Sequence, residues 1–329
     1  ILFYTSMIIG TMISISSYSW MGMWMGLEIN LLSIIPLMGS SKNQFSSEAA
    51  MKYFISQAMA SSILIMSMIM MNFNMYMQNP NNIEIISNSA LFIKMGAAPF
   101  HFWFPEVMEG LSWMNCMIMM TWQKIAPMIM TMYMNNQQML LMIVIISSMT
   151  ISGIIGMNQT SMRKILAYSS INHLGWMLSS IYLNEPIWMK YFLIYSIMTL
   201  NMIMIMSKMN TFYAKQMIQT MSMNKSIKLM FFLNFLSLGG LPPFIGFFPK
   251  WITINSMTSQ NMIFMPSLMV ILTLITLYFY TRLMFTSMTL NMNETNKMMF
   301  KKLPPKWMLS MNLFTLMSIP ICIMSTNLI

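Results

Sequence analysis

Four ionisable side chains lie deep inside apolar stretches of this sequence, where charged residues are rare. They are Glu28, Lys94, Lys124 and Lys250. Placing one charged group in membrane hydrocarbon costs on the order of 2.5–3.5 kcal/mol, even on lenient insertion scales. Desolvation disfavours the charged form of a buried amine and a nearby carboxylate restores it, so such groups can exchange protons. These residues therefore predict a route for protons or ions through a membrane-embedded helical bundle.

The apolar stretches are long enough to cross a membrane, since 57% of the 329 residues are hydrophobic and only 7% are charged. A span needs roughly 20 apolar residues. The sequence predicts eleven spans, over 2–17, 22–40, 53–73, 84–104, 112–134, 139–157, 164–183, 189–207, 227–254, 262–285 and 307–328. These stretches are too long and continuous for barrel strands. We expect an all-α polytopic membrane protein with a single transmembrane domain over 1–329, no folded head and no cleaved leader.

The basic residues predict how the bundle is oriented. Thirteen of the seventeen lie in loops that follow even-numbered spans: Lys42, Lys52, Arg163, Lys164, Lys208, Lys215, Lys225, Lys228, Arg282, Lys297, Lys301, Lys302 and Lys306. Lys190 alone follows an odd-numbered span. By the positive-inside rule, the even loops face the compartment of synthesis, and Glu106 and Glu109 on that side count little. Orientation thus accounts for the net charge of +10, and we expect no nucleic-acid partner.

Two segments of the sequence resemble each other at a constant offset of 144 residues. Five pairs coincide: Gly96 with Gly240, Pro99 with Pro243, Phe100 with Phe244, Phe104 with Phe248, and Pro105 with Pro249. They lie in the fourth and ninth spans, which cross the membrane in opposite directions, as inverted repeats do. We expect two inverted five-helix repeats, spans 1–5 over about 1–134 and spans 6–10 over about 139–285, and then a last helix over about 307–328.

Proline should break the fourth and ninth spans, because it removes a backbone donor and clashes with the preceding turn. Pro99 lies in the fourth span, and Pro242 and Pro243 lie in the ninth. A broken helix in a membrane is tolerated only inside protein or beside water. A simple kink is the alternative reading, but two breaks at matched positions with lysines nearby favour a polar interior.

Five motifs carry a resemblance to a known family, over 26–30, 94–106, 122–127, 163–176 and 238–251. In order and residue type they are similar to the subunit 2 family of NADH dehydrogenase, an antiporter-like family of mitochondrial respiratory complex I. Met reaches 53 residues and Asp is absent, a bias that fits an invertebrate mitochondrial genome. The motifs look like an animal form of arthropod type, in which eleven spans are expected.

This resemblance implies a role for each matched position. Glu28 and Lys94 resemble the family's buried Glu–Lys pair, and Lys124 resembles its central proton-carrying lysine. Lys250 resembles the terminal lysine, and His173 resembles a residue that helps water to bridge Lys124 and Lys250. We hypothesise a lateral pathway in the order Glu28, Lys94, Lys124, His173, Lys250. The alternative is that each lysine only binds a helix or extends its amine to the surface, and that Glu28 and His173 are structural.

The resemblance also implies the setting of the chain. It implies a subunit of the proton-translocating NADH:ubiquinone reductase in the mitochondrial inner membrane, with its N-terminus in the matrix and its C-terminus in the intermembrane space. NADH, FMN, iron–sulfur clusters and ubiquinone would be bound by other subunits. Cys116 and Cys322 form no CxxC motif, so we expect no metal or redox centre in this chain. Subunits 4L and 4, supernumerary subunits and lipids such as cardiolipin would be its partners.

Two other functions stay open. The chain could be a stand-alone or Mrp-type cation/proton antiporter subunit, or it could be a purely structural subunit that tethers its neighbours. The mitochondrial codon bias and the expected absence of three spans disfavour the antiporter. The cost of several buried lysines disfavours the purely structural role.

Overall fold

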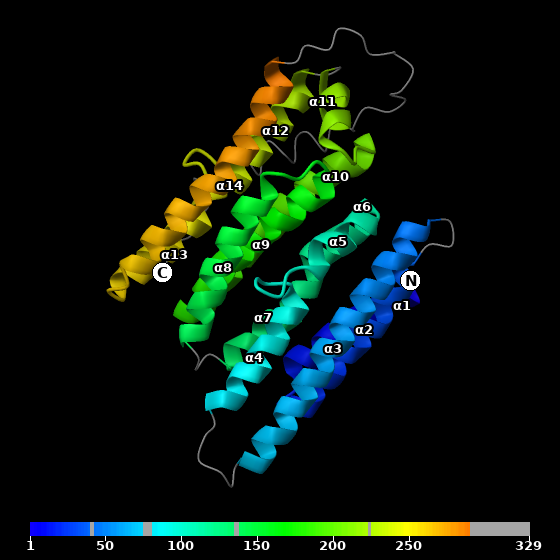
Figure 1. Ribbon diagram of the computed structural model, residues 1–329, viewed down its shortest axis with the longest axis vertical. Helices are drawn as coiled ribbons and strands as arrows, with labels where there is room; N and C mark the ends of the chain where they lie inside the picture. Colours follow the sequence, from blue (N-terminus) through cyan, green and yellow to red (C-terminus); the bar gives the residue numbers. More distant parts are fainter. Residues whose placement is uncertain (40–42, 75–80, 135–137, 223–224, 290–329) are drawn as a thin grey trace. The chain divides into compact units, whose positions relative to one another are not determined.

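A computed structural model describes residues 1–39, 43–74, 81–134, 138–222 and 225–289. Within these ranges the chain is helical, and an isolated antiparallel bridge joins Ser161 to Tyr213. The helices (Figure 1) are α1 Leu2–Ser16, α2 Trp20–Met38, α3 Gln44–Asn74, α4 Asn81–Met95, α5 Trp103–Gly110, α6 Trp113–Met120, α7 Trp122–Tyr133, α8 Gln138–Gly156, α9 Met162–Leu183, α10 Glu185–Met209, α11 Ala214–Ser222, α12 Lys225–Gly239, α13 Phe247–Ser259 and α14 Phe264–Thr289. The predicted last helix over 307–328 lies outside the described residues.

Five of the described helices are long and apolar enough to cross a membrane: α2, α3, α8, α10 and α14. The fourth, fifth and ninth predicted spans are divided into shorter helices, α1 has only 15 residues, and α9 carries many polar residues. The protein is thus an all-helical membrane protein, as predicted, while the total of eleven spans stays a prediction.

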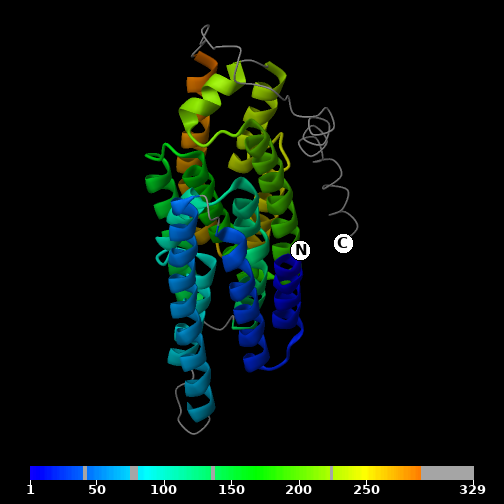
Figure 2. The ribbon, with the colours of Figure 1, turned by 90° about the vertical axis from the view of Figure 1, so that its right-hand side faces the viewer.

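The chain forms two compact units, Ile1–Ser148 and Met149–Ile329, which are described separately. In the first unit, α2 packs against both α1 and α3, and these three helices lie side by side (Figure 2). In the same unit α4 packs against α3 and α7. In the second unit, α10 packs against α9, α12 and α13, and α14 packs against α12. The predicted repeat boundaries at about 134 and 139 remain untested predictions.

Glycines bring α1 and α2 into close contact. A Cβ atom added to Gly26 would lie 2.5 Å from the backbone nitrogen of Ser14, and one added to Gly10 would lie 2.9 Å from the backbone nitrogen of Asn30. Both distances are too short for a side chain, so only glycine permits this crossing. The crossing holds α2, which carries Glu28 and Asn30, firmly against α1.

The fourth and ninth predicted spans are broken where the sequence predicts. In the first unit, α4 ends at Met95 and α5 begins at Trp103. In the second unit, α12 ends at Gly239 and α13 begins at Phe247. Both the ends and the beginnings differ by the 144 residues that separate the two sequence motifs.

The two breaks also share their backbone turns. Gly96 and Gly240 have φ values of 71° and 81°, a left-handed conformation that glycine adopts without steric cost. In each unit the N–H of the following residue donates to the carbonyl five residues before it, at 3.0 Å in the first unit and 3.3 Å in the second. This is the bond of a Schellman ending, which satisfies a carbonyl at the helix terminus. Aligned positions therefore adopt the same local fold.

Two features depart from the sequence prediction. The fifth predicted span, 112–134, is interrupted at Thr121, between α6 and α7. There the Thr121 backbone has φ and ψ of −113° and −75°, and its hydroxyl donates to the Met117 carbonyl at 2.7 Å. The second feature is α11, a short helix within the predicted loop over 208–226.

We expect Gly26→Ala to destabilise the first unit by about 1–3 kcal/mol, because the added methyl group would overpack the crossing of α1 and α2. Thermal unfolding in detergent measures the effect as a lower midpoint. Gly39→Ala is the matched control, since a Cβ there would meet its nearest neighbour at 3.8 Å. Equal midpoints for the two variants would contradict the close-contact interpretation.

Candidate functional site

Glu28 and Lys94 form an ion pair between α2 and the last turn of α4. The Lys94 Nζ lies 3.8 Å from the Glu28 Oε1, and the two side chains are 4% and 24% exposed, respectively. Glu28 Oε1 accepts no hydrogen bond from the described residues. A charge-assisted hydrogen bond measures about 2.7–2.9 Å. The two groups therefore interact electrostatically, and direct transfer of a proton needs a closer approach or a bridging water.

Lys124 is buried on α7, with 1% of its surface exposed. Its Nζ lies 5.4 Å from the centroid of the Phe104 ring, and an aromatic ring attracts a cation above its face. Phe104 is the second residue of α5, directly after the break in the fourth span. A Cβ added to Gly96 would lie 3.0 Å from the Phe104 Cβ. The glycine of the break thus makes room for the ring beside Lys124.

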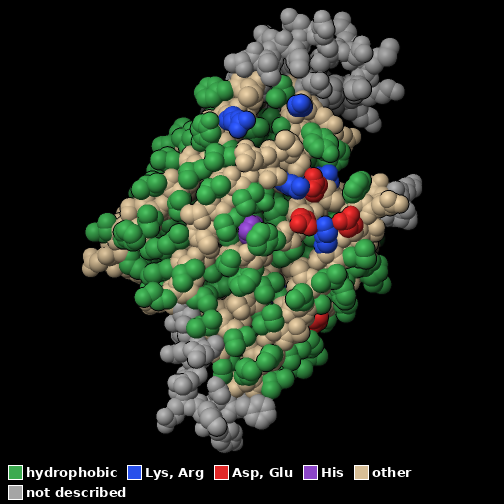
Figure 3. Space-filling view, viewed as in Figure 1, with side chains coloured by type: hydrophobic (Ala, Val, Ile, Leu, Met, Phe, Trp, Pro, Cys, Tyr) green, Lys and Arg blue, Asp and Glu red, His purple; other side chains and the backbone are tan. Residues whose placement is uncertain are grey.

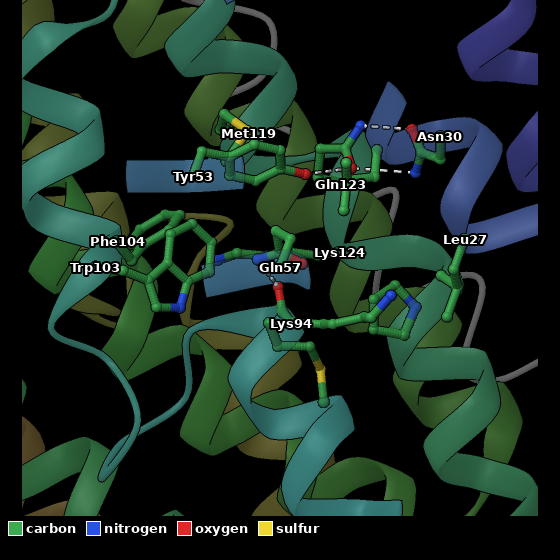
Figure 4. Close-up of a pocket in the computed structure, with 13 residues that line it drawn as sticks. Leu27, Asn30, Tyr53, Gln57, Lys94, Trp103, Phe104, Met119, Gln123 and Lys124 are labelled. Carbon is green, nitrogen blue, oxygen red and sulfur yellow. Dashed lines mark hydrogen bonds between the residues drawn. The ribbon is translucent and has the colours of Figure 1, made fainter. Parts of the chain in front are cut away.

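One cavity of the first unit is lined by both Lys94 and Lys124 (Figure 4). Its other polar lining residues are Asn30, Tyr53, Gln57 and Gln123. About 20 Å³ is left for the centre of a water-sized sphere, which is room for about one water molecule. Glu28 does not line this cavity, but its ion-pair partner Lys94 does. The cavity thus has room for a water molecule within a lining that includes both lysines.

An amide pair holds α2 against α7 beside this cavity (Figure 4). The Asn30 amide donates to Gln123 Oε1 at 3.1 Å, and the Gln123 amide donates to Asn30 Oδ1 at 2.8 Å. The Tyr53 hydroxyl on α3 donates to the same Gln123 oxygen at 3.4 Å. Because Asn30 follows Glu28 by two positions and Gln123 precedes Lys124, the pair fixes the helices that carry both residues.

Sequence reasoning missed this amide pair, although both residues lie in the motifs over 26–30 and 122–127. The signal that could have revealed them is their polarity, since an amide buried in an apolar span is costly unless it is hydrogen-bonded. The sequence gives no indication of which buried amide is the partner, because the two residues are 93 positions apart.

In the second unit, Lys250 on α13 turns back toward the preceding half of its span. Its Nζ donates to the carbonyl of Gly239, the last residue of α12, at 2.8 Å. The C-terminus of a helix carries partial negative charge, which attracts a cation. A Cβ added to Gly240 would lie 2.8 Å from this Nζ, so glycine also provides the space for the amine.

His173 is buried on α9, close to two tyrosines of α10. Its Nδ1 lies 3.0 Å from the Tyr191 hydroxyl oxygen, and its ring centroid lies 5.1 Å from that of Tyr195. Trp176, three residues further along α9 and therefore on the same face, has its ring centroid 5.8 Å from the Lys250 Nζ. One face of α9 thus carries His173 and also the ring beside Lys250.

The structure places the five predicted residues in two groups. Glu28, Lys94 and Lys124 belong to the first unit, and His173 and Lys250 belong to the second. Glu28 and Lys94 form an ion pair, and Lys94 and Lys124 share a cavity. Within the residues that the structure covers, no group of three or more His, Cys, Asp or Glu side chains is arranged to hold a metal ion.

Acidic and basic side chains also gather on the surface, on a face that is otherwise largely hydrophobic (Figure 3). Lys52 lies 2.9 Å from both Glu48 and Glu106, and all three side chains are exposed. Exposed pairs of this kind contribute about 0–1 kcal/mol. The pairing of Glu106 with Lys52 joins α5 to the first part of α3.

We expect Gln123→Leu and Asn30→Leu each to destabilise the protein by about 1–3 kcal/mol, because each leaves a buried amide without its partner. The double variant should lose less than the sum of the two, which is the signature of a direct interaction. Unfolding in detergent gives the three values, and Gln260→Leu at an exposed position is the control. Strict additivity would show that the amide pair carries no energy.

The chain is similar to known proteins both in sequence and in fold. The family model described as NADH:quinone oxidoreductase/Mrp antiporter, transmembrane, matches residues 17–276. The chain is 52% identical over 303 residues to NADH-ubiquinone oxidoreductase chain 2 of Anopheles gambiae, covering 91% of this chain and 88% of that one. It is 47% identical over 298 residues to the same chain of Locusta migratoria, covering 90% and 87%.

The fold is similar to that of a chain in the respiratory complex I from Thermus thermophilus with bound aureothin. The TM-score is 0.82, and the alignment covers 95% of this chain and 75% of that chain at 21% identity. At this identity the likeness concerns the fold alone, and it agrees with the family match over 17–276.

Proposed function

Since the chain belongs to the NADH:quinone oxidoreductase/Mrp antiporter family, as a chain 2 subunit of complex I, we propose that it translocates protons across the mitochondrial inner membrane. The observation that carries this proposal is the joining of the Glu28–Lys94 ion pair to Lys124 through one small cavity. The fold and the family match support it, and the buried charges give the chemistry.

The ion pair acts as the switch in this proposal. At about 4 Å and an effective dielectric constant near 20, two unit charges interact by about 4 kcal/mol. When Glu28 moves away or is neutralised, Lys94 loses this stabilisation in an interior where a charged amine is costly. Its proton then passes to Lys124 through the water that the cavity can hold. Return of the Glu28 charge draws a new proton onto Lys94.

In this proposal the proton then moves through His173 to Lys250, which are the last two residues of the pathway hypothesised from the sequence. Lys250 is suited to be the terminal group, because the carbonyl at the end of α12 stabilises its charged form. The matched breaks at Gly96 and Gly240 support the further proposal that the two units are inverted repeats with related half-channels.

Energy for the cycle comes, in this proposal, from quinone reduction elsewhere in the complex. NADH, FMN, iron–sulfur clusters and ubiquinone are bound by other subunits. The chain lies with its N-terminus in the matrix and its C-terminus in the intermembrane space, next to subunits 4L and 4. The competing functions are those of an Mrp-type antiporter subunit and of a purely structural subunit. The first test below separates proton transfer from a structural role.

We expect both Lys124→Met and Lys124→Arg to lower proton pumping per NADH oxidised by about tenfold or more. Methionine removes the charge, whereas arginine keeps a charge but cannot release its proton. Pumping is measured with a pH-sensitive dye in proteoliposomes of the intact complex, after a native gel confirms assembly. Lys208→Met, at an exposed position, is the control. Normal pumping with arginine would show that Lys124 is only a structural cation.

Glu28→Gln should also reduce pumping, because it removes the charge that switches Lys94 while keeping a similar shape. Glu48→Gln is the matched control, since Glu48 pairs with Lys52 at the surface. The same dye measurement on assembled complex compares the two variants. Full pumping by Glu28→Gln would mean that the ion pair is not part of the transfer.

A further inference from the structure

A cavity much larger than the one beside Lys94 and Lys124 lies in the second unit, away from the residues assigned to proton transfer. Its volume is about 690 Å³. Four segments line it: residues 156–160 at and after the end of α8, Ile165 on α9, residues 213–218 around the start of α11, and residues 279–286 near the end of α14. The proton-transfer proposal uses none of these residues, so the cavity needs a separate explanation.

The cavity is placed where apolar spans end. Helix α8 ends at Gly156, which lines the cavity, and α14 ends at Thr289, three residues after the lining residue Thr286. Helix α10 ends at Met209, four positions before Tyr213 in the lining. Apolar spans cover the hydrocarbon of the bilayer, and their ends lie at the headgroups. The cavity is therefore at headgroup depth.

The loops that form one wall are held together by backbone bonds. The N–H of Met162 donates to the Phe212 carbonyl at 2.8 Å, and the N–H of Ala214 donates to the Thr160 carbonyl at 3.1 Å. These bonds flank the bridge between Ser161 and Tyr213. Backbone hydrogen bonds thus join the loop after α8 to the start of α11.

The start of α11 has the character of an interfacial helix. Lys215 and Gln216 are exposed, whereas Met217 is fully buried. A short helix with basic and polar residues on one side and apolar residues on the other is typical of a segment that lies in the plane of the membrane surface. This agrees with the depth that the ends of the spans indicate.

The lining combines positive charge with an apolar wall. Lys215 and Arg282 are its charged members, and none of the described lining residues is acidic. Asn158, Gln159 and Thr160 add amide and hydroxyl groups, while Ile165, Phe279 and Leu283 are apolar. Guanidinium binds phosphate in a bidentate manner and lysine binds it as a point charge. An apolar wall contributes nothing to a free phosphate ion, but it suits an acyl chain.

We propose that this cavity binds one anionic phospholipid. Its phosphate lies between Lys215 and Arg282, and the first part of an acyl chain packs against the wall of Ile165, Phe279 and Leu283. The site is independent of the proton-transfer residues, so failure of either proposal leaves the other standing.

The test uses the intact, delipidated complex in phosphatidylcholine nanodiscs that contain a minor fraction of a photoreactive phosphatidylglycerol. After illumination, peptide mapping should find label within residues 156–165, 213–218 or 279–286. Labelling should fall about fivefold for Lys215→Gln or Arg282→Gln and about 30-fold for the double variant, as expected when two charges near a membrane surface contribute equally. The matched control is Lys208→Gln, an exposed lysine outside the lining, which should label like the unmodified complex.

Two further arms identify the ligand. A photoreactive phosphatidylcholine should label these peptides much less, and inorganic phosphate should not compete with the phosphatidylglycerol. Equal labelling by the zwitterionic lipid, or unchanged labelling of the double variant, would overturn the proposal. Competition by inorganic phosphate would assign the site to free phosphate and would equally overturn it.

Discussion

A polar group inside this protein must find a protein partner or a trapped water, because the surrounding hydrocarbon offers none. Three interactions in the first unit follow this constraint. Lys94 lies near Glu28, Lys124 lies beside Phe104, and Asn30 is paired with Gln123. Each partnership joins two different helices. The residues that carry the proposed chemistry therefore also determine how the helices of this unit are held together.

The second unit meets the same constraint through its own backbone. A break in a span exposes helix ends, and in water these would be satisfied by solvent. Here the turn after α12 satisfies one carbonyl through the chain itself, and the Lys250 amine satisfies that of Gly239. The break is thus tolerated because the titratable side chain of Lys250 donates to the carbonyl at the end of α12.

The sequence predicts what depends on local chemistry. Apolar length predicts the helices, and the repeated glycines and prolines predict both the positions of the two breaks and their 144-residue spacing. It does not predict partners that are distant in the chain. The amide pair of Asn30 and Gln123 leaves no periodic pattern. The hydroxyl bond of Thr121 does not reveal the interruption either, because many threonines in helices form such a bond without a break. Charge inside apolar stretches singles out Glu28, Lys94, Lys124 and Lys250. The family motifs add His173 and imply the Glu28–Lys94 pair, which the fold places at 3.8 Å.

The glycine turn that ends α4 and α12 has a consequence for how the two units differ. The backbone turn is the same in both units, but a different side chain packs against its glycine. The Phe104 ring lies beside Gly96, and the Lys250 amine lies beside Gly240. The same turn therefore packs against an uncharged side chain in one unit and a charged side chain in the other. Two units with this turn can therefore differ in function through the side chain that packs against the glycine, while the surrounding helices stay the same.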